Sequence, residues 1–352
     1  MCKQIVQWFL AIVISLIILN SIVSFYALSP GFLHRDGGAT RGVWMPESFI
    51  VKGDEGRSIS RVDRNGYINV SDKLADSEYV LFMGNSQSNG IQVDADKRYI
   101  SLLNHKLQEA NADDRVYAYN VSADGSDFCD LVSGFTAAVQ EFPNSRAVVL
   151  QIGSTNWSLD KLQNCTVQRP FMQEQTGAYM AAHLSGKQKL RHVIKVGFPF
   201  PIYLKEVKIK DIKLNFHNAF WHSEAGEISE EETILDVDWD MYERALEDVC
   251  SFLHRNYDGQ LFILELPSVS LRGGGKLENS YGIRQELFDK VCKENDIVYI
   301  NMYDIYCREY TTHQVLPYGF SNTKPGYGHL NEEGHQMIAD TLFPLLDKEA
   351  ER

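Results

Sequence analysis

The chain has 352 residues, of which 44% are hydrophobic, and its formal net charge is −13. This length allows one large domain or two small ones with a proper hydrophobic core. Because phosphate groups require a cationic surface, an acidic chain argues against a nucleic-acid partner.

The N-terminus contains a long apolar run, since residues 5–28 carry no charged side chain. A helix of that length, at about 1.5 Å per residue, spans the roughly 30 Å hydrocarbon core of a bilayer. A cleavable signal peptide is the competing interpretation, but its apolar region would be only about 7–15 residues long. We therefore predict a retained membrane anchor at 1–28. A short tail is more easily left in the cytoplasm than a large domain, so we expect the domain on the exported side.

Residues 29–76 are rich in Gly, Arg, Asp and Ser, and they predict a loop-rich lead-in with one short strand near 47–53. From residue 78 onward, buried apolar runs alternate with segments of helical spacing. We expect strands at 79–84, 115–121, 146–153, 260–266 and 296–302, and helices at 98–108, 127–141, 283–294 and from about 332, with Asn331 as its cap. This alternation predicts an α/β fold, with a parallel sheet covered on both faces.

The pattern is interrupted between about 160 and 258, which we interpret as an insertion. Residues 187–213 hold eight Lys or Arg against two acids, whereas residues 222–243 hold nine acids and no Lys or Arg. One interpretation is a solvated insertion whose two halves neutralise each other. The other is a lid or substrate-docking element over the site.

Five of the six cysteines follow the predicted anchor, and none forms a CxxC pair, so we expect no zinc cluster. Their number permits up to two disulfides with one thiol left over. The pairing does not follow from the sequence.

Polar residues suited to catalysis follow the predicted strands. Ser86 comes after the first strand, Gly125 after the second and Asn156 after the third. His329 comes just before the final helix. Since ligands on parallel sheets sit at the carboxyl ends of the strands, we expect these residues to converge on one rim.

Each of these residues suits a step of ester cleavage. A serine hydroxyl becomes a nucleophile when a base such as neutral His329 takes its proton. The negative charge that builds up on the carbonyl oxygen would be held by the N–H groups of Ser86 and Gly125 and by the amide of Asn156. This chemistry needs no metal and no other cofactor.

These segments resemble the motifs of the SGNH (GDSL-type) hydrolases over residues 77–346. MGNSQSNG at 83–90 is similar to the first family block, GDS-x-x-x-G, with Asn85 in place of the usual Asp. NVSADG at 120–125 resembles the second block, N-x-x-x-x-G, and HLNEEGHQMIADTL at 329–342 resembles the block around the catalytic histidine. The resemblance implies a flavodoxin-like three-layer fold and a serine-dependent hydrolysis or transfer of ester-linked acyl groups. The anchored lead-in also resembles bacterial members associated with envelope polysaccharides.

Two departures from the family pattern affect the site. The third block usually has Asn two residues after Gly, but Thr155 stands there and Asn156 is one residue later, so either could point inward; we favour Asn156. The family usually has Asp three residues before the histidine, but Gly326 occupies that position. His329 would then be oriented by a backbone carbonyl, by an acid from elsewhere in the chain, or by nothing.

Four further residues are candidates for substrate binding or for support of the site: Asn85, Asn120, Thr155 and Trp157. We expect Asn120 to tie its loop through hydrogen bonds, and Trp157 to be either a wall of the cleft or part of the core. His335 is expected on the helix surface.

Together these features predict an anchor at 1–28, a lead-in at 29–76 and an SGNH-like hydrolase domain at 77–350. We expect the domain to hydrolyse an ester, an O-acyl or O-acetyl group on an envelope or extracellular glycan or a lipid-like ester. The alternatives are an acyltransferase that modifies an extracellular polysaccharide and a catalytically inactive glycan-binding or assembly protein. The expected partners are this substrate and the membrane.

Overall fold

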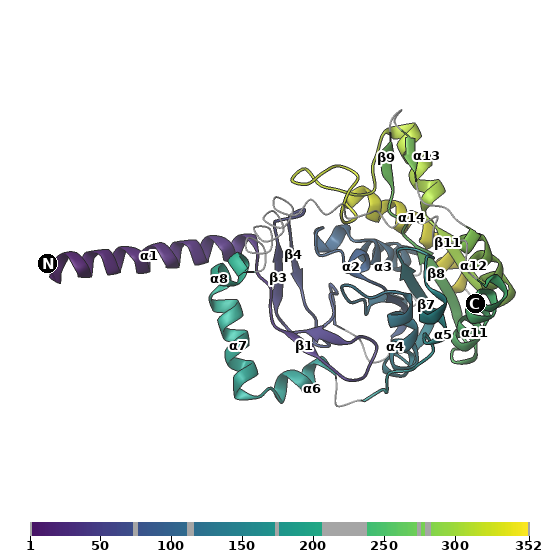
Figure 1. The fold of residues 1–352 in the computed structure, drawn as a ribbon, viewed down its shortest axis with the longest axis horizontal. Coiled ribbons are helices and arrows are strands. Elements are labelled where there is room, and N and C mark those ends of the chain that lie inside the picture. Colours follow the sequence, from purple (N-terminus) through teal and green to yellow (C-terminus); the bar gives the residue numbers. More distant parts are fainter. Residues whose placement is uncertain are drawn as a thin grey trace.

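A computed structural model describes residues 2–72, 77–110, 116–172, 176–205, 238–272, 276–278 and 283–350 (Figure 1). The helices are α1 (Cys2–Tyr26), α2 (Ser86–Asn89), α3 (Tyr99–Ala110), α4 (Phe128–Glu141), α5 (Leu159–Gln163), α6 (Gly177–Ala182), α7 (Gly186–Gly197), α8 (Pro199–Tyr203), α11 (Trp239–Arg255), α12 (Ile283–Glu294), α13 (Tyr303–His313) and α14 (Glu332–Ala350). The strands are β1 (Phe32–His34), β2 (Gly42–Trp44), β3 (Phe49–Lys52), β4 (Ser58–Arg61), β5 (Glu78–Met83), β6 (Val116–Asn120), β7 (Ser145–Ile152), β8 (Gln260–Glu265), β9 (Ser270–Arg272), β10 (Lys276–Glu278) and β11 (Ile297–Asn301).

The central sheet has five parallel strands in the order β11-β8-β7-β5-β6. Numbered along the chain, this is the flavodoxin-like order 2-1-3-4-5. The order reverses between β5 and β7, so the crevice for a ligand is expected at the carboxyl ends of these two strands.

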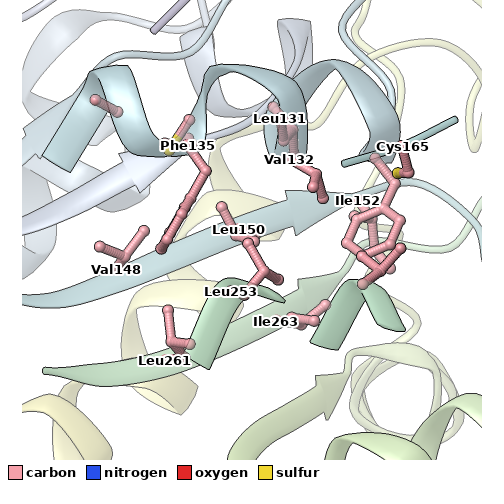
Figure 2. Packing of buried hydrophobic residues seen from close by; sticks show 14 of the residues in the cluster. Leu131, Val132, Phe135, Val148, Leu150, Ile152, Cys165, Leu253, Leu261 and Ile263 are labelled. Carbon is pink, nitrogen blue, oxygen red and sulfur yellow. The ribbon is translucent and has the colours of Figure 1, made fainter. Parts of the chain in front are cut away.

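Helices cover both faces of this sheet, because its apolar side chains alternate between two cores. One core joins Leu81 and Val148 to α4, α11 and α12, and Figure 2 shows α4, β7, β8 and α11 meeting in it. The other core joins Phe82 and Val149 to α3, α13 and α14. The predicted three-layer α/β fold is therefore confirmed. Asn331 also caps α14 as expected, since its Oδ1 accepts the Gly334 N–H at 2.9 Å.

The lead-in contains more structure than the one short strand that was predicted. It forms two antiparallel pairs, β1–β2 and β3–β4. It also runs beside the edge strand β6: Asn69 Oδ1 accepts the Asn120 N–H at 2.9 Å, and Asn69 Nδ2 donates to the Asn120 carbonyl at 3.0 Å. Buried Asp63 accepts hydrogen bonds from Asn69 and from the Tyr119 hydroxyl. The sequence pattern missed these strands because each has only three or four residues.

The insertion predicted at about 160–258 needs a correction at its end. α11 lies within those bounds, yet it packs on the sheet with Tyr242, Leu246, Val249 and Leu253 buried in the core. Residues 206–237, which include most of the acidic stretch at 222–243, lie outside the described residues. The cysteines of the described domain, Cys129, Cys165, Cys250, Cys292 and Cys307, are free thiols.

The N-terminal helix α1 projects from the rest of the molecule, and α7 runs crosswise to it beyond α8 (Figure 1). Within the described part of the chain, α1 has the length and composition to cross a membrane, since an 18-residue window inside Lys3–Tyr26 has a mean hydropathy of 2.4. A signal sequence would meet the same criterion.

Candidate active site

Ser86 lies at the turn between β5 and the short helix α2, at the carboxyl edge of the sheet. Gly84 permits this turn, because a Cβ there would collide with the side chains of Ser88 and Gln151. Asn85 caps α2 by accepting the Gln87 N–H at 2.9 Å, a task that Asn and Asp perform equally well. The replacement of the usual Asp by Asn85 therefore leaves the turn intact.

Three side chains from distant parts of the chain form a continuous hydrogen-bonded row. The Ser86 hydroxyl lies 3.0 Å from Nε2 of His329. Nδ1 of the same ring lies 2.6 Å from Oε2 of Glu55, and the other Glu55 oxygen accepts the His329 backbone N–H at 2.7 Å. The nucleophile, base and acid of a serine hydrolase have this connectivity.

The charge of Glu55 determines which ring nitrogen of His329 carries the proton. Burial alone would raise the pKa of the Glu55 carboxyl, but hydrogen bonds from the His329 ring and backbone outweigh burial and lower this pKa. A carboxylate only accepts hydrogen bonds, so Nδ1 must donate to it. In the neutral ring, Nε2 is then the unprotonated nitrogen, and it can accept the Ser86 proton.

Two glycines allow Glu55 to approach the imidazole. Gly56 has φ +67°, and a Cβ there would meet the backbone carbonyl of Gln92. Gly328 has φ +94°, and a Cβ there would collide with the Glu55 carboxylate itself. The side chain of Asn322 holds the loop at residues 53–56 in place. It accepts the Gly56 N–H at 3.0 Å and donates to the carbonyls of residues 53 and 56 at 3.1 Å.

Position 326 shows why the acid does not come from its usual place. Gly326 has φ +76°, a left-handed conformation that is strained for an aspartate. Of the three origins considered for the group that orients His329, the structure has an acid from elsewhere. Glu55 was missed because it precedes the nucleophile and lies 274 positions from His329, with no motif spacing to link them. The glycine at 326 was the available signal, since it left the histidine without a local acid.

Gln87, the residue after the serine, was also missed, and its side chain forms hydrogen bonds with the backbone of both residues that flank His329. Its Oε1 accepts the Leu330 N–H at 2.9 Å, and its Nε2 donates to the Gly328 carbonyl at 3.3 Å. One side chain on α2 thereby fixes the histidine segment relative to the serine.

The loop that carries Gly125 lies beside the serine turn. The Ala123 N–H donates to the Gly84 carbonyl at 3.0 Å, and Asn89 donates to Asp124 at 2.7 Å. Gly125 is exposed at φ +75°, and a Cβ there would meet nothing within 4 Å. Among the described residues, no acceptor takes the N–H of Ser86 or Gly125, so both donors remain available to a ligand.

Thr155 and Asn156 differ in burial. Thr155 is buried, and its carbonyl accepts hydrogen bonds from the Trp157 N–H at 3.1 Å and the Tyr242 hydroxyl at 3.4 Å. Asn156 is exposed on the loop after β7, next to the turn that carries Ser86. Exposure leaves Asn156 the better placed of the two to meet a substrate.

Two supporting residues and His335 are buried. Asn120 ties its loop, since Oδ1 accepts the Ser122 N–H at 2.9 Å and Nδ2 donates to the Ser88 carbonyl at 3.2 Å. Trp157 stacks on Phe128 in the core, with ring centroids 4.4 Å apart. The expectation that His335 lies on the helix surface is wrong: it is fully buried, which lowers its pKa to about 3.

No protein-family model and no curated protein matches the sequence. Among solved structures, the chain is similar to a two-domain esterase active on acetylated mannans, at 10% identity and a TM-score of 0.43, over 78% of this chain and 50% of that one. It is also similar to an acetyl xylan esterase, at 14% identity and a TM-score of 0.41, over 76% of this chain and 99% of that one. A catalytic mutant of an acetylxylan esterase from Geobacillus stearothermophilus matches at 11% identity and a TM-score of 0.40, over 79% of this chain and 96% of that one. The chain thus spans about half the length of the first of these proteins.

Proposed function

We propose that the protein is a membrane-anchored serine esterase of the SGNH type, in which Ser86, His329 and Glu55 form the catalytic triad. The observation that carries this proposal is the unbroken row from the Ser86 hydroxyl through both ring nitrogens of His329 to Glu55, at 3.0 and 2.6 Å. The family-like motifs at 83–90, 120–125 and 329–342 support the same assignment.

In the first half of the reaction, the Ser86 oxygen attacks the ester carbonyl carbon while its proton passes to Nε2 of His329. The new imidazolium is stabilised by the Glu55 carboxylate through Nδ1. The N–H groups of Ser86 and Gly125 and the Asn156 amide donate to the oxyanion. Collapse of the tetrahedral intermediate breaks the bond to the alcohol, which leaves with the proton from Nε2.

In the second half, Nε2 takes a proton from water, and the resulting hydroxide attacks the acyl-serine carbonyl. The bond to the Ser86 oxygen then breaks, the serine recovers its proton from Nε2, and the carboxylic acid is released. A sugar hydroxyl in place of water would make the same site an acyltransferase.

The substrate we propose is an O-acyl group, such as O-acetyl, on an extracellular or envelope glycan. The exposure of the rim supports a bulky polar substrate, because Gly125, Gly153 and Asn156 are exposed and Tyr327, two residues before His329, is 71% exposed. A Cβ at Gly153 would have only the Asn85 amide within 4 Å, at 3.9 Å, which leaves open space beside the serine. Sites for small ligands, by contrast, are usually concave and enclose most of the ligand. The open rim therefore favours a substrate of which only the acyl group enters the site.

The test is labelling of the detergent-solubilised full chain with a fluorophosphonate, together with hydrolysis of an aryl acetate. Ser86→Ala should abolish both, and Ser158→Ala should retain both, because Ser158 is an exposed serine on the neighbouring loop whose side chain makes no capping hydrogen bond. Circular dichroism would confirm that both variants are folded. Hydrolysis that survives in Ser86→Ala would refute the assignment.

The two alternatives are separated by the same preparation. Wild-type protein that is folded but neither labelled nor active would support an inactive glycan-binding role. Product analysis with an acetyl donor and an oligosaccharide acceptor would reveal an acyltransferase, because acetylated oligosaccharide would then accumulate instead of free acetate.

A further inference from the structure

The helix α7 presents an apolar stripe that nothing in the described structure covers. Leu190 and Val193 are each 60% exposed, and Ile194 beside them is 44% exposed. Their spacing places them on one side of the helix. Phe198, which follows the helix, is 60% exposed as well. Contiguous apolar surface of this kind marks an interaction site.

Basic residues flank the apolar stripe of α7. The helix contains Lys187, Lys189, Arg191 and Lys195 and no acidic residue. At 100° per residue, Lys187 and Lys189 lie at the two borders of the apolar stripe. A helix with an apolar face bordered by lysines is typical of segments that lie in the interface of an anionic membrane.

The opposite side of α7 faces the lead-in. Gln188, Arg191, His192 and Lys195 line a cavity of about 470 Å³ together with β1, and His192 Nδ1 accepts the Gly31 N–H at 3.3 Å. The polar side is therefore turned toward the protein, and the apolar stripe is turned away from it.

The continuation of α7 contacts the candidate membrane span. Asn20 of α1 donates to the Gly197 carbonyl at 2.6 Å and accepts the Phe200 N–H at 3.2 Å. The rings of Tyr26 and Tyr203 meet edge to face, with centroids 5.9 Å apart. Asn20 lies six residues before Tyr26, the last residue of α1, which corresponds to about 9 Å along the helix. Interfacial helices are buried to about 5–10 Å, so α8 contacts α1 at a matching depth.

We propose that α7 and α8 form an interfacial membrane-binding element that lies on the bilayer surface next to the end of α1. The apolar stripe would enter the headgroup–acyl boundary, and Lys187 and Lys189 would bind anionic phospholipid headgroups. The element would fix the height and tilt of the domain above the membrane. This inference requires α1 to cross the bilayer, but it is independent of the proposed esterase chemistry.

The experiment uses the full chain reconstituted into vesicles, with an environment-sensitive fluorophore on one introduced cysteine. Val193→Cys reports on the apolar stripe. Gln188→Cys, on the same helix but facing the cavity, is the matched control. Protein without an introduced cysteine is labelled in parallel to correct for the native thiols. Quenching is measured with doxyl-labelled lipid and with aqueous iodide.

If α7 lies in the interface, the label at residue 193 should be quenched by doxyl lipid and protected from iodide, and the label at residue 188 should not be quenched by doxyl lipid. A residue-193 label that iodide quenches and lipid does not would overturn the proposal. Protection from both quenchers would also overturn it, because the stripe would then be covered by protein, either a second copy or another segment.

The electrostatic part is tested by the lipid composition. In vesicles that contain phosphatidylglycerol, Lys187→Gln or Lys189→Gln should each lower the ratio of embedded to exposed label about fivefold, as expected for one lysine near an anionic surface. In pure phosphatidylcholine, these substitutions should have little effect. Equal behaviour in both lipids would show that headgroup charge plays no part.

Discussion

The lead-in and the sheet domain differ in how their sequences encode structure. The strands of the sheet are five to eight residues long and almost continuously apolar, because both faces of the sheet are covered. The strands of the lead-in have three or four residues and carry no such run. The proposed triad nevertheless draws on both regions, since Ser86 and His329 come from the sheet domain and Glu55 comes from the lead-in. A region without a clear pattern can therefore supply a residue that the patterned region lacks.

The contribution of the lead-in to catalysis is best tested at Glu55. Glu55→Gln should lower kcat/KM for an aryl acetate by about 10³–10⁴-fold, because the amide cannot hold the His329 tautomer or stabilise the imidazolium. Steady-state kinetics on the solubilised full chain measures the effect. Because Ser86 itself is unchanged in this variant, slow labelling by fluorophosphonate should persist.

The neighbouring acid provides the control for this substitution. Asp54 pairs with Lys52 at 3.0 Å and makes no described contact with His329, so Asp54→Asn should leave kcat/KM nearly unchanged. Equal losses in the two variants would mean that the lead-in acts only by folding, and the assignment of Glu55 as the acid would fall.

Within the sheet domain, the choice between Asn156 and Thr155 is a second test. If the Asn156 amide donates to the oxyanion, Asn156→Ala should lower kcat by about 10²–10³-fold with little change in KM. Thr155→Val keeps the shape of a buried side chain, so it should lower the melting temperature while kcat stays close to the wild-type value. The reverse result, with the catalytic loss at Thr155, would assign the inward-pointing donor to the position that the family pattern names.

The elements of the sheet domain could be predicted from the sequence because each strand and helix leaves a local signal. β8, for instance, is Gln260–Glu265 where 260–266 was expected. The positions of Ser86 and His329 followed from motifs together with the rule that ligands lie at strand ends. The burial of His335 could not be predicted, because its stacking on Tyr99 depends on how α14 packs on α3.

Glu55 could not be predicted for a different reason. The contact between Glu55 and His329 depends on the left-handed backbone at Gly56 and Gly328 and on the Asn322 clamp. No single segment of sequence contains these features together. The sequence showed that the usual acid is missing at position 326, but the identity of its replacement required the three-dimensional structure.

A smaller effect is expected at Gln87, which holds the two halves of the site together. Gln87→Ala removes its hydrogen bonds to the Leu330 N–H and the Gly328 carbonyl, so kcat should fall about tenfold, given that one hydrogen bond contributes roughly 0.5–1.5 kcal/mol. Gln87→Glu keeps the acceptor for Leu330 but not the donor for Gly328, so it should retain an intermediate kcat. No difference between Gln87→Ala and wild type would show that the two loops hold their register without this side chain.

The smallest effect concerns the pH dependence of stability, which reports on the attachment of the lead-in to the sheet domain. The folded pKa of Glu55 is lowered below its ordinary value of 4.5, because the hydrogen bonds from His329 outweigh burial. The unfolded chain therefore binds the proton at higher pH than the folded chain. The stabilisation is complete above the unfolded pKa and is lost as pH falls through the folded pKa.

Chemical denaturation of wild type and Glu55→Gln between about pH 7 and pH 3 should reveal this term. The difference in unfolding free energy should be largest near neutral pH and should shrink as the pH falls below 4.5. Glu333→Gln, which removes an exposed carboxylate from α14, serves as the control and should not reproduce this convergence. If the gap between wild type and Glu55→Gln stays constant or widens in acid, the ionised carboxylate does not attach the lead-in to the histidine segment, and its role would be restricted to catalysis.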